Sequence, residues 1–181
     1  MDKQIQFKLD AAEKFLSKIP KKAPKNHTEL QKMEENSEAF LFFASGVIEI
    51  VKRQINDKFE IFDRQNVFYI HGLRKNLTDS GPQKKVKETI GNYFTAPKYT
   101  GVRVDVTKSS LWRLQALRNQ AMHGNIIKVQ GQVLAFTYAI HQGRTIHEFV
   151  QKTRYPQRYF EQILHQLKKF TAQTCKILSK S

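Results

Sequence analysis

Apolar residues recur at steps of three and four positions along most of the chain, a spacing that predicts amphipathic helices. The first stripe lies within residues 2–19, and Pro20 ends it because proline disrupts a helix interior. A second helix is predicted from Thr28, the N-cap of a capping box that Gln31 completes, to about Asn56. No proline interrupts this long helix, and we expect it to be the backbone of the fold.

The second half of the chain combines shorter helices with a change of period. Between residues 125 and 140 the pattern favours strands on both sides of a Gln-Gly-Gln turn, which predicts a β-hairpin. Residues 95–107 are interpreted as a loop with room for one strand, and residues 141–156 as a polar connector. Helical spacing occurs in four further segments: residues 67–77, 84–94 (a short helical turn), 107–124 (with Ser109 or Ser110 as N-cap and Gly124 as the stop) and a last stretch from about Pro156.

These elements predict an all-α fold, an antiparallel bundle of four to five helices with a β-hairpin inserted near residues 125–140. The chain has 181 residues, of which 40% are hydrophobic and 26% charged, a balance typical of a soluble globular protein. Neither an internal repeat nor a shift in composition marks a boundary. Residues 1–181 are therefore interpreted as a single domain.

The charge of the chain points to a polyanionic partner. Lys and Arg number 31 against 16 Asp and Glu, giving a net charge of +15, which attracts RNA before other partners. No apolar run approaches the ~18 residues of a membrane span, and the N-terminus lacks the apolar core of a signal peptide. Cys175 is the single cysteine, which excludes an internal disulfide and fits a reducing compartment. We expect a cytoplasmic protein without membrane association.

Common cofactor and metal signatures are missing from the sequence. There is no GxxxxGK or GxGxxG phosphate loop, no HExxH pair and no cysteine pair for zinc. His141 and His147 lie in the polar connector and are interpreted as solvated, and Glu34, Glu35 and Glu38 as a charge-balancing helix face. We therefore expect no cofactor and no metal, so a nuclease built on this chain would act without one.

The stretch LRNQAMHGN, residues 117–125, carries the clearest candidate chemistry. Histidine transfers protons near neutral pH, and arginine grips two phosphate oxygens at once, so Arg118 and His123 suit cleavage of RNA by its own 2′-hydroxyl. Asn119 could orient either side chain. On a continuous helix Arg118 and His123 lie about 140° apart. Convergence therefore requires either that Gly124 unwinds the helix end or that two copies meet across a two-fold axis.

The hexapeptide RNQAMH resembles the R-N-x-x-x-H motif of the HEPN superfamily (higher eukaryotes and prokaryotes nucleotide-binding), and the stretch EAFLFFASGVIEIVKRQIN resembles a core helix of that superfamily. Together they cover about a seventh of the chain. The resemblance implies that Arg118 and His123 are catalytic and Asn119 auxiliary. It also implies a polar residue on the long helix, with Glu49 favoured and Ser45 as the alternative. The other interpretation of Glu49 is a structural partner for a lysine or arginine.

The resemblance implies an all-α homodimer from the toxin–antitoxin, abortive-infection or CRISPR-associated ribonucleases. The expected function is metal-independent cleavage of single-stranded RNA, leaving a 2′,3′-cyclic phosphate and a 5′-hydroxyl. An antitoxin or a nucleotidyltransferase is an expected partner. The alternative is a non-catalytic HEPN-like module that binds nucleic acid or a protein partner. Four aromatic residues would then either stack unpaired bases among lysines or fill the core: Tyr93, Phe94, Tyr99 and Trp112.

Overall fold

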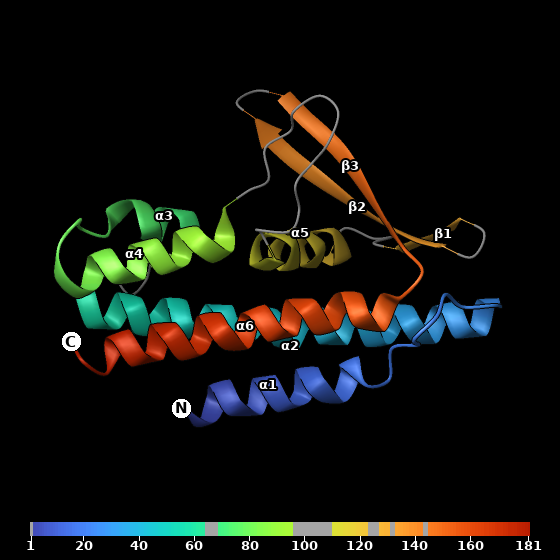
Figure 1. Cartoon of the computed structure of the whole chain (residues 1–181), viewed down its shortest axis with the longest axis horizontal. Coiled ribbons are helices and arrows are strands. Elements are labelled where there is room, and N and C mark those ends of the chain that lie inside the picture. The colour runs from blue at the N-terminus through green and yellow to red at the C-terminus, as the bar shows by residue number, and fades with distance from the viewer. Residues whose placement is uncertain (1, 64–68, 96–109, 123–126, 131–132, 143–144) are drawn as a thin grey trace.

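The computed structural model describes residues 2–63, 69–95, 110–122, 127–130, 133–142 and 145–181. These residues form six α-helices and a three-stranded sheet (Figure 1). The helices are α1 (Lys3–Leu16), α2 (His27–Phe59), α3 (Ile70–Asn76), α4 (Gly81–Phe94), α5 (Ser110–Met122) and α6 (Pro156–Leu178). The strands are β1 (Ile127–Gln130), β2 (Val133–Gln142) and β3 (Thr145–Thr153).

Three helices, α1, α2 and α6, lie side by side along the long axis of the molecule, with α3, α4 and α5 on the side away from α1 (Figure 1). Helix α1 runs antiparallel to the other two, whereas α2 and α6 run in the same direction. Phe40, in the first half of α2, packs on Phe160 near the start of α6, with ring centroids 5.1 Å apart. The expected helical bundle with an inserted hairpin is confirmed. Within the described part of the chain, no helix is long and apolar enough to cross a membrane.

The long helix α2 begins with a different capping box from the predicted one. Asn26 is the N-cap, and its Oδ1 accepts a hydrogen bond from the Glu29 amide at 2.9 Å. Glu29 Oε2 in turn accepts from the Lys25 amide at 2.8 Å. The prediction of Thr28 and Gln31 was wrong, because Asn26 already has the extended backbone of an N-cap and Glu29 stands three positions later.

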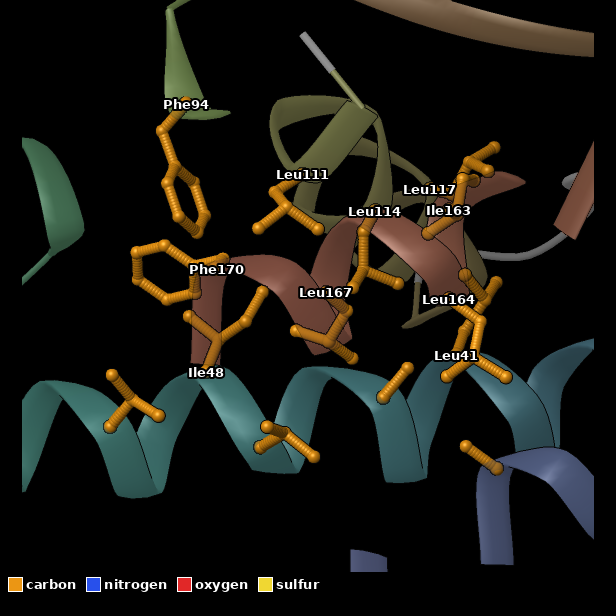
Figure 2. Packing of buried hydrophobic residues seen from close by; sticks show 14 of the residues in the cluster. Leu41, Ile48, Phe94, Leu111, Leu114, Leu117, Ile163, Leu164, Leu167 and Phe170 are labelled. Atoms are coloured by element: carbon orange, nitrogen blue, oxygen red, sulfur yellow. The ribbon is translucent and has the colours of Figure 1, made fainter. Parts of the chain in front are cut away.

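Helix α5 is held by leucines that point into the space between α2 and α6 (Figure 2). Leu111, Leu114 and Leu117 are fully buried, at the three-residue spacing that keeps them on one side of the helix. This packing holds α5 against α2 and α6. The proposed caps Ser109 and Gly124 and the loop residues 96–107 lie outside the described residues.

The three strands form an antiparallel sheet in the order β1-β2-β3. The predicted hairpin corresponds to β1 and β2, in which Ile127 pairs with Phe136. Residues 141–156 were expected to be a polar connector, but they contain the end of β2 and all of β3, because pairing with β2 satisfies a strand's backbone whatever its side chains. Phe136 anchors the sheet by stacking on Tyr159 of α6, with centroids 4.7 Å apart.

Candidate functional site

A cleft of about 420 Å³ opens where the middle of α2 meets α1, α3 and α5, and we call it the α2–α5 cleft. Four residues of α2 lie at successive steps of three, one and three positions, so they share one face of that helix: Phe42, Ser45, Gly46 and Glu49. The neighbouring face of α2 is buried in the core. The cleft is therefore attached to the best-packed part of the molecule.

Helix α5 supplies the opposite wall of the cleft. Gln115, Arg118 and Asn119 stand at positions i, i+3 and i+4, which places them on one face. Arg118 Nη1 donates a hydrogen bond of 3.4 Å to Asn119 Oδ1, and both side chains are exposed. Arg118, Asn119, Glu49 and Ser45 thus line one cleft, although about seventy positions separate the two pairs in sequence. His123 lies one residue beyond α5, outside the described residues.

Glu49 also has the structural partner that its other interpretation required. Its Oε2 lies 2.6 Å from Nζ of Lys52, one turn further along α2. The Lys52 residue is only 6% exposed, whereas the Glu49 side chain is 54% exposed. Pairing with Glu49 compensates for taking the Lys52 ammonium out of water, and one carboxylate oxygen remains available to a ligand.

The cleft carries an excess of positive charge. Its lining contains Lys8, Lys52 and Arg118 against the single carboxylate of Glu49. Among the described residues, no carboxylate lies within salt-bridge distance of Arg118. A planar guanidinium that is exposed and not bound to a carboxylate is suited to binding two phosphate oxygens. The arrangement favours an anionic ligand.

Lys8 reaches the cleft from α1 and is held over two aromatic rings of α2. Its Nζ lies 5.0 Å from the ring centroid of Phe42 and 5.0 Å from that of Phe43, which is cation–π distance. Gly46 leaves room for this approach, because a Cβ there would lie 3.2 Å from Lys8 Cδ and the lysine side chain would have to shift slightly. Lys8 is therefore a positioned cation rather than a freely moving surface lysine.

His71 is a cleft residue that the sequence analysis missed. It lies in α3, and its imidazole is at the mouth of the cleft. Surrounding protein atoms lower its pKa below the usual 6.5 by withholding water from the charged form, and the positive charge of Arg74 lowers it further. His71 is therefore mostly neutral near pH 7 and able to accept a proton. A lone histidine in a short helix offers no sequence pattern that would have marked it.

Three of the four aromatic residues that were expected either to stack bases or to fill the core lie in the core or against it. Phe94 is buried, and its ring centroid lies 5.1 Å from that of Phe170. Tyr93 contacts the same ring at 5.7 Å, and Trp112 is partly buried against the core cluster. Tyr99 lies outside the described residues. Of the four residues, the three that can be judged support the interpretation that they fill the core.

Metal ligands and known relatives add no further residues to the site. Within the described ranges, no three His, Cys, Asp or Glu side chains come close enough together to hold a metal ion. The site is therefore characterised by its positive charge and its exposed arginine. Comparison of the chain with models of protein families, with curated proteins and with solved structures gives no significant match.

Proposed function

We propose that the protein is a metal-independent endoribonuclease of HEPN type that cleaves single-stranded RNA. The supporting observation is that Arg118 and Asn119 of α5 share one cationic cleft with Glu49 of α2. These are the residues that the resemblance to the HEPN superfamily nominates. They stand on two helices that the leucine core of α5 holds together.

The proposed reaction is an internal transesterification. The 2′-oxygen of a nucleotide loses its proton to His123, the proposed base, and attacks the adjacent phosphorus. The bond from phosphorus to the 5′-oxygen breaks, and that oxygen takes up a proton from water, while His123 later returns its proton to the solvent. Arg118 binds the phosphate oxygens as negative charge builds on them, and Asn119 orients the guanidinium. The products are a 2′,3′-cyclic phosphate and a 5′-hydroxyl.

A homodimer is part of the proposal. If the helix continued to His123, that residue would lie about 140° from Arg118, and a second copy across a two-fold axis would then complete each site. A role in a toxin–antitoxin or defence system, with an antitoxin or a nucleotidyltransferase as partner, is proposed on the resemblance alone.

The second candidate function is a module that binds nucleic acid without cleaving it. The excess of cations in the cleft favours it, because Lys8, Lys52 and Arg118 attract phosphates whether or not a proton is transferred. The two functions differ in whether a product forms.

The deciding experiment incubates the protein with end-labelled single-stranded RNA in EDTA. The wild type and a control variant, Arg158→Ala/His165→Ala, should release cyclic-phosphate products, because both control residues are exposed on α6 away from the cleft. Arg118→Ala/His123→Ala should release none. Equal cleavage by the Arg118/His123 variant would refute the assigned site. RNA binding by all three proteins without cleavage would favour the binding module.

A further inference from the structure

We infer that the rim of the α2–α5 cleft is a subsite for unpaired nucleotides, in which Phe42 and Tyr69 stack on bases while Lys8 and Arg118 bind the flanking phosphates. The inference deepens the proposed function and rests on it in taking RNA as the strand. It concerns how the strand is held rather than how it is cut.

The first observation is the exposure of the two rings. Phe42 is 64% exposed and Tyr69 78%, and they are two of the five large hydrophobic side chains that are exposed in the described part of the chain. Both rings line the cleft: Phe42 belongs to α2, and Tyr69 is the N-cap residue of α3. Burying an exposed aromatic ring against a base is favourable, since every base has a flat apolar face.

The second observation is that two cations, Lys8 and Arg118, line the same cleft as these rings. Lys8 Nζ lies over Phe42, yet most of that ring remains accessible to a ligand. Arg118 faces the same cleft from α5, and its guanidinium has no carboxylate partner among the described residues. A single strand presents both bases and phosphates, so a rim that holds both aromatic rings and cations matches its chemistry.

The same rim discriminates against duplexes. In a double helix each base is stacked on its neighbours, so its faces are not available to a side chain. Only an unpaired base can lie on Phe42 or Tyr69. A protein partner would also cover exposed rings, but the charges of the cleft and the net charge of +15 favour a polyanion.

The test measures binding by fluorescence anisotropy in EDTA, with fluorescein-labelled oligouridylate as the single strand and the same oligomer annealed to oligoadenylate as the duplex. Phe42→Ala and Tyr69→Ala should each weaken single-strand binding about tenfold. Tyr69→Phe should restore it, since the ring rather than the hydroxyl stacks. The matched controls Phe7→Ala and Tyr155→Ala remove exposed rings outside the cleft and should bind as the wild type does.

Three results would overturn the subsite: losses no greater than those of the control variants, duplex binding as tight as single-strand binding, or no binding of oligouridylate by the wild type. A dimer that dissociates on Phe42→Ala, without RNA binding, would assign the rim to self-association instead. The subsite and the nuclease fail separately. If RNA binding requires both rings but no cyclic phosphate forms, the subsite is supported and the nuclease is refuted. If cleavage and binding are unchanged when either ring is removed, the subsite is refuted and the nuclease is supported.

Discussion

Two hollows of similar size lie along α2, and they differ in the side chains that line them. The α2–α5 cleft encloses about 420 Å³, and a second hollow between the ends of α2 and α6 encloses about 460 Å³. We call the second one the α2–α6 hollow; its lining consists of Gln54, Asp57, Lys58, Cys175, Leu178 and Ser179. Volume therefore does not separate the two.

Charge and aromatic content do separate them. In the α2–α6 hollow the charges of Asp57 and Lys58 cancel, and the lining contains no aromatic ring. In the α2–α5 cleft three cations face one carboxylate beneath two exposed rings. A hollow becomes a candidate binding site when its lining favours one class of ligand, and only the cleft meets that condition.

The largest expected effect concerns the packing behind the cleft. Leu114→Ala removes a fully buried side chain between α2 and α6 and should lower the free energy of unfolding by about 2–5 kcal/mol. Because α5 carries Arg118, RNA affinity should fall as well. Urea denaturation and anisotropy measure the two effects. Leu178→Ala changes a partly buried residue that lines the α2–α6 hollow and should lower the free energy of unfolding by less. An equal loss of stability in the two variants would show that both regions are packed alike.

Charge reversal compares the two hollows directly. Lys8→Glu/Arg118→Glu should weaken binding of single-stranded RNA about a hundredfold, equivalent to about 2.7 kcal/mol. The slope of log affinity against log salt should fall by about 1.4, or about 0.7 for each lost phosphate contact. The control Lys58→Glu/Lys176→Glu makes the same change in net charge beside the α2–α6 hollow. Equal weakening by both variants would mean that affinity follows total charge and not the cleft.

A smaller effect should follow the protonation of His71. Its pKa is lowered in the folded protein, so the unfolded chain binds more protons as pH falls through about 6. The stability it contributes is present above its unfolded pKa and is lost on acidification. Protonation also adds a cation to the cleft, so RNA binding should strengthen a few-fold as pH falls from about 7 to about 5.

Imidazole NMR titration gives the His71 midpoint, expected below 6.5. His71→Gln should reduce the pH dependence of RNA binding, whereas His165→Gln, at an exposed position on α6, should leave it unchanged. If RNA binding by the wild type and by His71→Gln depended on pH in the same way, the charge of His71 would not contribute to RNA binding in the cleft.

The smallest expected effect belongs to the α2–α6 hollow. Burial raises the pKa of the Cys175 thiol. Alkylation by iodoacetamide near neutral pH should therefore be a few-fold slower than for a model thiol, because the thiolate is the reactive form. Urea should abolish the difference. Fast alkylation of the folded protein would mean that this hollow is more open and reactive than its lining indicates.

The sequence predicted the helices better than their arrangement. The apolar stripe of α2 includes Phe40, which is buried, and excludes Phe42, which is exposed, so helical phase alone distinguished these two rings. The shared direction of α2 and α6 was not predictable, because it depends on how the segments between them pack. Strand β3 was missed because its many polar residues suggest a connector, whereas the strand is defined by backbone pairing with β2.

The candidate site was predictable where its residues belong to one local motif. Arg118 and Asn119 are adjacent, and Glu49 interrupts an apolar run, so each has a sequence signal. Lys8, Tyr69 and His71 have none, because they reach the cleft only through the packing of α1 and α3. Tyr93, Phe94 and Trp112 were considered for stacking because lysines surround them in the sequence, but their helices turn them toward the core.

The construction of the cleft from four helices also gives it a thermodynamic signature. Its walls come from α1, α2, α3 and α5, so the complete cleft exists only in the folded chain. Any ligand that binds there and not to the unfolded chain must raise the melting temperature by mass action. Melting curves recorded with different oligonucleotides, nucleotides and polyanions would therefore rank ligands by the increase in melting temperature that each produces. The ranking requires no assumption about a reaction, because it depends only on binding to the folded protein.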